Sequence, residues 1–418
     1  MTRTARAIAA VLVATSVLAA PRPAAAYSVL AHETMIDAVW DDVIAPMLAR
    51  RYPRVTAEDI RNARAYAYGG SVIQDLGYYP FGSHLFTNLV HYVRSGDFVD
   101  ALVKDAQNVD DFAFALGAVA HYASDNEGHP LAVNRSVPLL YPKLRAKYGD
   151  RVTYVEDPRR HIMVEFGFDV VQVAGGAYLP DSYRAFIGFE VAKPLLERAF
   201  TETYGLELKD LFADEDLAIG TYRYAVSQMI PEITTAAWKD KQDEIRRAAK
   251  TVPRDSFIYH FTRQEYERAY GATYHRPGVL ARFLTFVFNL LPKVGPFKTL
   301  AFRPPTPQTE QLFAQSFRAA RERYRMLLGG ARDGRIDLAN TDFDTGRLAV
   351  WGEYPLADRT YTELLDKLSD RRFANVPPGL RSDVMRYFAD IDGRKLTDKK
   401  ARRRAEAVRR ELAALAAN

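Results

Sequence analysis

Histidines and carboxylates occur at metal-ligand spacing in the first half of the chain. The run His121-Tyr-Ala-Ser-Asp125-Asn-Glu-Gly-His129 places three such residues four positions apart. Residues four apart on an α-helix project from neighbouring turns of the same face, so a nitrogen, a carboxylate and a second nitrogen share one stripe. Such a stripe suits a divalent metal ion.

The same spacing recurs at His161-Ile-Met-Val-Glu165, and the upstream residues Asp75, His84 and His32 add further donors. A single pair of this kind is more often a surface pair or a buried, hydrogen-bonded histidine than a metal site. Two pairs with three more donors favour the metal interpretation, because the set holds five of the eight histidines. Since the chain has no cysteine, the ligands must be nitrogen and oxygen atoms, which favours hydrolytic zinc over a cysteine-bound structural zinc.

The first 26 residues have the pattern of an export signal. Arg3 and Arg6 charge its start, residues 8–20 are apolar, and three alanines at 24–26 offer a cleavage site. An uncleaved anchor is the alternative, but the apolar run is shorter than the about 20 residues of a membrane span. We therefore expect residues 1–26 to be a signal peptide, the mature chain to begin at Tyr27, and the protein to be secreted or periplasmic.

Composition and periodicity predict an all-α protein. The chain has 418 residues, of which 48% are apolar, so it can bury two ordinary cores, and its net charge of +5 is only a weak hint of anionic partners. From His32 to about residue 250, apolar residues recur at three- and four-residue spacing, with breaks expected at Gly69-Gly70 and elsewhere. Residues 27–250 are therefore predicted to form a multi-helix bundle with an inward-facing zinc cluster.

Residues 251–418 are predicted to form a second, mostly helical region of unknown role. Residues 279–291 are very apolar but too short and too interrupted to span a bilayer. They form either a buried helix or, with the patch up to Phe302, an interfacial segment, so 279–302 is a candidate for peripheral membrane contact. An amphipathic helix is expected over 306–328, ended by Gly329-Gly330, and a basic helix over 395–417.

Four stretches of the sequence resemble one known family. They are Tyr27-Ser-Val-Leu-Ala-His32, the run from Gly70-Ser-Val-Ile-Gln-Asp75 to His84, Ala118-Val-Ala-His121-Tyr-Ala-Ser-Asp125, and His161-x3-Glu165. Together they resemble the bacterial zinc-dependent phospholipase C family, whose fold is shared by trinuclear zinc nucleases. The resemblance covers roughly residues 27–250.

The resemblance implies a site for up to three zinc ions. Carried over residue by residue, the implied ligands are Asp75, His84, His121 and Asp125 for the first ion, His129, His161 and Glu165 for the second, and His32, Asp125 and the amine and carbonyl of Tyr27 for the third. Asp125 would bridge the first and third ions. Cleavage before Tyr27 would then have a chemical purpose, because it releases the amine that acts as a ligand.

The sequence departs from the family pattern in two places. His129 follows Asp125 by four residues instead of six, so either the helix end is remodelled or the second ion is held less completely. The gap between Asp75 and His84 is short, which makes His91 a competing ligand. We prefer His84 here, because the residues after His91 resemble a scaffold helix of the family.

Metal-activated water acting on a phosphodiester is the expected chemistry, with Asp75 as the proton acceptor. The implied substrate is a phospholipid, cleaved to diacylglycerol and a phosphorylated headgroup. The alternatives are a nuclease of the same fold, with nucleic acid as partner, or a non-catalytic helical protein stabilised by metal. Glu33, Asp37 and Asn134 are candidates for residues that hold the ligand histidines in place.

Overall fold

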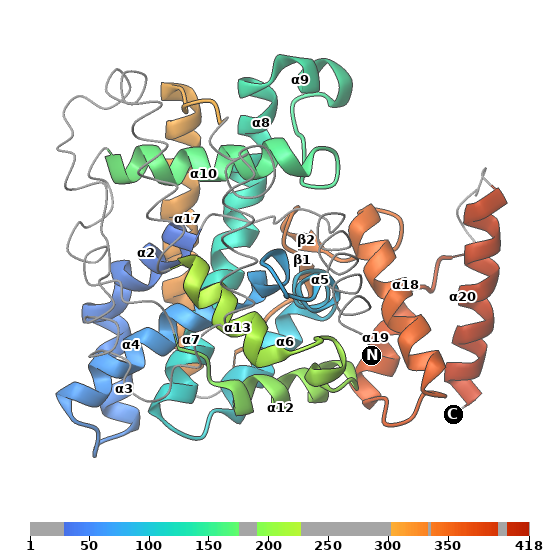
Figure 1. The fold of residues 1–418 in the computed structure, drawn as a ribbon, viewed down its shortest axis with the longest axis horizontal. Coiled ribbons are helices and arrows are strands. Elements are labelled where there is room, and N and C mark those ends of the chain that lie inside the picture. Colours follow the sequence, from blue (N-terminus) through green and yellow to red (C-terminus); the bar gives the residue numbers. More distant parts are fainter. Residues whose placement is uncertain (1–28, 175–189, 227–301, 333–335, 392–398, 418) are drawn as a thin grey trace, which may run out of the picture.

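The computed structural model describes residues 29–174, 190–226, 302–332, 336–391 and 399–417. Figure 1 shows a bundle of helices running in several directions, with α18, α19 and α20 gathered at one end. The expected signal peptide, Tyr27, and residues 279–301 of the expected membrane segment lie outside the described residues.

The first half is built from helices and helical turns. Its α-helices are α2 (Val29–Val39), α3 (Ala45–Arg51), α4 (Ala57–Val72), α5 (His84–Tyr92), α6 (Ser95–Asp105), α7 (Val109–Gly128), α8 (Asn134–Leu140), α9 (Pro142–Tyr148), α10 (Pro158–Ala174), α12 (Lys193–Tyr204) and α13 (Glu215–Tyr224). Two π-helical turns (Trp40–Ile44 and His129–Val133) and two 3-10 helices (Ile73–Tyr78 and Leu208–Asp210) lie between them.

The described part of the second half is also mainly helical. It contains α17 (Pro307–Arg332), α18 (Pro355–Asp370), α19 (Pro378–Tyr387) and α20 (Lys399–Ala417). The strands β1 (Thr341–Asp342) and β2 (Arg347–Leu348) form a short antiparallel hairpin with Thr341 opposite Leu348. The all-α prediction is confirmed, and this hairpin is the one sheet within the ranges that the structure describes.

Helix α7 is the centre of the bundle. Asn108 caps its start by accepting a hydrogen bond from the Asp111 backbone nitrogen at 2.9 Å. Nearly all its residues from Asp111 to Gly128 are buried, as expected for a helix that other helices surround. Helices α4 and α17 both pack against it, so the ligands that α7 carries lie in the interior.

Glycines allow α4 and α7 to approach closely. A Cβ atom on Gly70 would lie 1.8 Å from the Phe114 carbonyl oxygen, and one on Gly117 would lie 2.1 Å from that of Ala67. Gly69-Gly70 was expected to break the helix, and this was wrong, because both residues lie inside α4. Their role is to remove side-chain bulk where the two backbones meet.

The described second half packs into the same apolar core as the first. Ala320, Tyr324 and Leu328 of α17 belong to one buried cluster with the side chains of α7. The Tyr324 hydroxyl donates to the Leu116 carbonyl oxygen at 2.9 Å. Helix α17 continues to Arg332, so the expectation that Gly329-Gly330 ends it was also wrong.

Segments that were candidates for membrane contact are only partly described. Phe302, the last residue of the 279–302 segment, is buried with its ring 5.5 Å from that of Phe166. Within the described ranges, no helix has both the length and the apolar character needed to cross a membrane.

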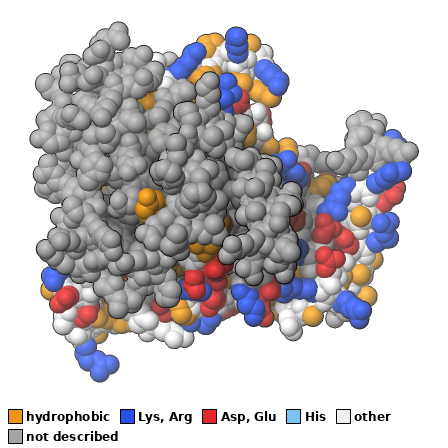
Figure 2. All heavy atoms as spheres, in the orientation of Figure 1, with side chains coloured by type: hydrophobic (Ala, Val, Ile, Leu, Met, Phe, Trp, Pro, Cys, Tyr) orange, Lys and Arg blue, Asp and Glu red, His pale blue; other side chains and the backbone are white. Residues whose placement is uncertain are grey.

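The basic C-terminal helix α20 turns its apolar side chains inward. Ala405, Val408 and Leu415 enter the core, and Arg404 forms an ion pair with Asp366 of α18. Figure 2 shows positive and negative side chains interspersed at this end of the molecule. The charge run is therefore a solvated face in which some charges are paired.

Candidate metal centre

Three groups of buried donors converge inside the bundle. Within each group the candidate ligand atoms all lie within 4.8 Å of one another. The groups are His32, His121 and Asp125; Asp75, His91 and His121; and His129, His161 and Glu165. All eight residues are at most 2% exposed, so their charges need compensation from within the protein.

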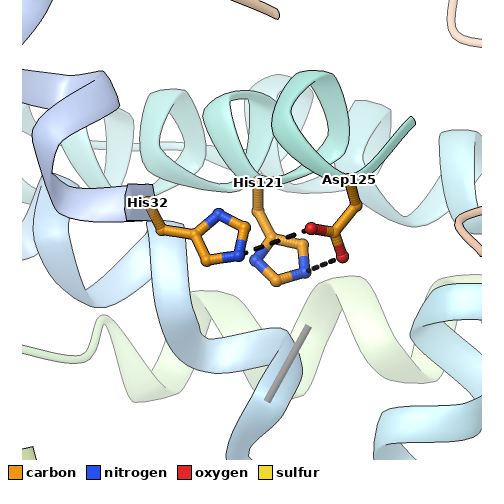
Figure 3. Close-up of side chains that lie close together, drawn as sticks. All are labelled: His32, His121 and Asp125. Carbon is orange, nitrogen blue, oxygen red and sulfur yellow. Dashed lines mark ion pairs between the residues drawn. The ribbon is translucent and has the colours of Figure 1, made fainter. Parts of the chain in front are cut away.

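Asp125 lies between two of the groups. One oxygen, Oδ1, is 3.4 Å from His32 Nε2, while Oδ2 is 3.2 Å from His121 Nε2 and 3.7 Å from His91 Nε2. Figure 3 shows His32 reaching across from α2 toward Asp125 and His121 on α7. Because the two oxygens face different histidines, this carboxylate can bridge two ions.

The tautomer of His121 is set by helix packing. Its Nδ1 lies 2.9 Å from the Ser71 carbonyl oxygen, which accepts a hydrogen bond but cannot donate one. Nδ1 must therefore carry the proton, which leaves the Nε2 lone pair facing Asp125. Ser71 follows Gly70 in α4, so the close approach of α4 and α7 supplies this carbonyl.

His91, and not His84, lies in the donor group with Asp75. His91 Nε2 is 3.4 Å from Asp75 Oδ1, and its Nδ1 is 2.8 Å from the Thr87 carbonyl oxygen. His84 begins α5, is only partly buried, and has its ring 6.2 Å from that of Tyr78. Two turns further along α5, His91 reaches the interior, so the residue that the sequence offered as the competing ligand is the one that lies in this donor group.

His129 reaches the third group through a remodelled helix end. After Gly128 the chain widens into the π-helical turn His129–Val133. His129 Nε2 then lies 3.4 Å from Glu165 Oε1, and His161 Nε2 lies 2.9 Å from the same oxygen. The unusual spacing of His129 is therefore compatible with a shared ion.

Residues that sequence reasoning missed also contact this group. The hairpin between β1 and β2 brings the Phe343 carbonyl oxygen to 3.0 Å, and Asp344 Oδ1 to 3.3 Å, from His129 Nδ1. Asn134, a sequence candidate for holding the site, donates to the Asp344 carbonyl oxygen at 2.7 Å. The sequence signal for this loop is the turn-forming run Asp344-Thr-Gly346, but nothing local connects it to a histidine far earlier in the chain.

The other two sequence candidates are placed differently. Asp37 forms an ion pair with Arg64 and accepts a hydrogen bond from Tyr68. Glu33 is buried, and burial raises its pKa well above the ordinary value, with Asp37 and Asp169 adding to the effect.

The electrostatics of the cluster favour cations. Burial alone lowers the pKa of His129, but Asp125, Asp344 and Glu165 outweigh it and hold this pKa well above its ordinary value. Burial likewise opposes the charge on Asp125, yet His121 and His129 hold the pKa of this carboxyl far below its ordinary value. The Asp75 carboxyl differs, because burial raises its pKa despite the nearby histidines.

The donor set fits divalent metal ions. Both oxygens of Asp75, Asp125 and Glu165 are buried and have no hydrogen bond among the residues that the structure describes. Leaving such atoms unsatisfied costs about 1–3 kcal/mol each, and more for charged groups. Imidazole nitrogens and carboxylate oxygens are ligands that zinc takes, so ions at these groups would compensate the buried negative charge.

Comparison with known proteins agrees with this geometry. Residues 31–214 match a family model described as zinc dependent phospholipase C. This stretch, which is less than half of the chain, is similar to the zinc-dependent phospholipase C family. Searches of curated proteins and of solved structures find no match to the chain.

The matched stretch contains all three donor groups, which could hold up to three metal ions. It ends before α17, so the hairpin that contacts His129 lies outside the matched residues. The match supports a hydrolase that uses zinc.

Proposed function

We propose that this protein is a secreted phosphodiesterase of the phospholipase C type, which hydrolyses phospholipids to diacylglycerol and a phosphorylated headgroup. The observation that supports this most directly is the convergence of three buried histidine and carboxylate groups inside a domain of the zinc-dependent phospholipase C family. Clustered divalent ions suit the cleavage of a charged diester.

The proposed ligands follow the three groups. They are Asp75, His91, His121 and Asp125 for the first ion, His129, His161 and Glu165 for the second, and His32, Asp125 and the amine and carbonyl of Tyr27 for the third. Bound zinc supplies a Lewis acid that makes water nucleophilic near neutral pH and neutralises charge on phosphate oxygens.

Asp75 is the proposed proton acceptor. Its carboxylate is fully buried beside His91, and burial raises its pKa above the ordinary value. A carboxylate held at the metal site is in position to accept the proton that metal-activated water gives up. The fixed Nε2 lone pairs of His91 and His121 keep the ligand atoms aimed at the same space.

Secretion is part of the proposal. The charged start, apolar stretch and alanine cleavage site of residues 1–26 support removal of a signal peptide. The amine released at Tyr27 would join His32 and Asp125 at the third ion. We also propose that the 279–302 segment, apart from the buried Phe302, contacts the lipid surface.

The test uses the purified mature protein with phosphatidylcholine vesicles. We expect zinc-dependent release of phosphocholine, which a chelator stops and added zinc restores. Asp125→Ala is expected to abolish release. Zinc retention without any ester hydrolysis would mean a metal-stabilised, non-catalytic protein, and degradation of single-stranded nucleic acid in place of phospholipid would mean a nuclease.

A further inference from the structure

The hairpin of the second half contacts the ligand histidine His129. The Nδ1 atom of His129 lies between two acceptors of this loop, the Phe343 carbonyl oxygen at 3.0 Å and Asp344 Oδ1 at 3.3 Å. Both acceptors require the proton to be on Nδ1, which leaves Nε2 facing Glu165 and His161.

Asp344 is itself held in place. It is only 2% exposed, and its second oxygen, Oδ2, accepts hydrogen bonds from the Tyr92 hydroxyl at 3.0 Å and from the Tyr354 hydroxyl. Its carbonyl oxygen accepts from Asn134. With both side-chain oxygens engaged, Asp344 cannot turn away from the His129 ring.

The hairpin is fastened to α5, which carries the donor His91, and to the next helix, α6. The Phe343 backbone nitrogen donates to the His91 carbonyl oxygen at 3.2 Å, and the Ser95 hydroxyl donates to the Thr341 carbonyl oxygen at 2.6 Å. The Phe343 ring lies 5.1 Å from the ring of His91 and 5.9 Å from that of His121. These contacts hold the hairpin in place beside the donor groups.

Gly346 makes the tight return possible. Its φ of 68° lies in the left-handed region, and a Cβ atom there would lie 2.6 Å from the Asn126 carbonyl oxygen. The loop therefore lies directly against the end of α7 that carries Asp125 and leads into His129.

We propose that Asp344 is a positioning residue for His129, so that the second half of the chain completes the metal site of the family domain. This inference rests on the proposed function only in requiring that His129 binds a metal ion. A carboxylate that holds the far nitrogen of a ligand histidine fixes the ring and strengthens it as a ligand, and losing such a partner typically weakens metal binding about 10–100-fold.

The test measures zinc binding to the full mature chain and not hydrolysis. Asp344→Ala is expected to weaken the binding of one zinc ion about 10–100-fold in competition with a chelator. Asp344→Asn keeps a side-chain oxygen that accepts from His129, so its loss of zinc affinity is expected to be smaller. Tyr354→Phe, which removes one partner of Asp344 and leaves the carboxylate, is expected to give a smaller loss still.

Asp383 provides the matched control. It lies on α19 of the same half, is buried, and accepts a hydrogen bond from the buried Tyr361 hydroxyl at 2.8 Å, but it lies in none of the donor groups. Asp383→Asn is expected to keep the zinc affinity of the wild type, even if its melting temperature falls.

The outcomes separate this inference from the proposed function. Wild-type zinc affinity in Asp344→Ala, or an equal loss in Asp344→Ala and Asp383→Asn, would overturn it. If Asp344→Ala does not fold, Tyr354→Phe decides by the same measurement. A protein whose zinc affinity depends on Asp344 but which cleaves no phospholipid would support this inference while refuting the proposed function.

Discussion

The Nε2 atoms of His91 and His121 lie 3.3 Å apart. Each ring has its Nδ1 atom within 2.9 Å of a backbone carbonyl oxygen, which requires the proton to be there. When both rings are neutral, their two lone pairs therefore face each other in a buried space, an arrangement that a proton or a metal cation between or beside them relieves. Asp75 and Asp125 supply the matching negative charge.

The choice between His91 and His84 can be tested directly. His91→Ala removes a donor of the buried group, so it is expected to lose one zinc ion and to reduce phosphodiester hydrolysis at least about 100-fold, in line with the loss of a direct ligand. His84→Ala, on the same helix but outside the donor groups, is expected to keep the wild-type zinc content. Metal analysis and phosphocholine release measure both, and the opposite ranking would restore His84 as the ligand.

Glycines at the contact of α4 and α7 are expected to be essential for stability. Gly70→Ala places a methyl group where the Phe114 carbonyl oxygen leaves no room, so we expect a loss of about 1–3 kcal/mol or more in the free energy of unfolding. Denaturant unfolding measures the change.

Gly329→Ala is the control for Gly70→Ala. Gly329 lies inside α17 with no neighbouring atom within 4 Å of an added Cβ. Alanine there should raise the free energy of unfolding by about 0.5–1 kcal/mol, because it favours the helix. Equal effects at the two sites would show that helix propensity, and not the close approach of α4 and α7, decides the outcome.

Zinc binding is expected to strengthen as the pH rises. In the metal-free protein the pKa values of His129 and His121 are raised, since the surrounding carboxylates outweigh burial. Protonation of these rings therefore stabilises the metal-free fold below about pH 6.5, and this contribution is lost as the pH rises through their folded pKa values. Zinc requires the neutral rings and must displace these protons.

The measurement is the melting temperature with zinc and with a chelator between pH 6 and pH 8. The difference between the melting temperatures with zinc and with chelator should grow with pH. The lowered pKa of Asp125 keeps its charge constant over this range, so Asp125 does not contribute to the change. A constant difference would show that the imidazoles do not release protons when the metal binds.

The free amine of Tyr27 is the last element of the proposed site. A chain that retains one residue before Tyr27 is expected to bind one zinc ion fewer than the mature chain, because an amide nitrogen cannot replace an amine as a ligand. The His32 and Asp125 side chains are unchanged in this variant, which isolates the effect of the amine. Equal zinc content and equal activity in the two chains would exclude Tyr27 as a ligand.

Sequence alone determined the parts of the site that lie on single helices. The pairs His121 with Asp125 and His161 with Glu165 follow from the four-residue repeat of an α-helix, and both pairs lie together in the structure. The all-α class followed from periodicity for the same reason. Local spacing is sufficient where one helix carries both groups.

Tertiary structure decided which residues from different parts of the chain meet, because no local pattern contains this information. His84 and His91 lie on the same helix, and only the packing of α5 shows that His91 meets Asp75. Gly70 and Gly329 are both helix-interior glycines, but one lies against a backbone and the other faces open space. Asp344 reaches His129 from a hairpin in the other half of the chain, because burial of shared apolar surface, and not sequence proximity, brings these segments together.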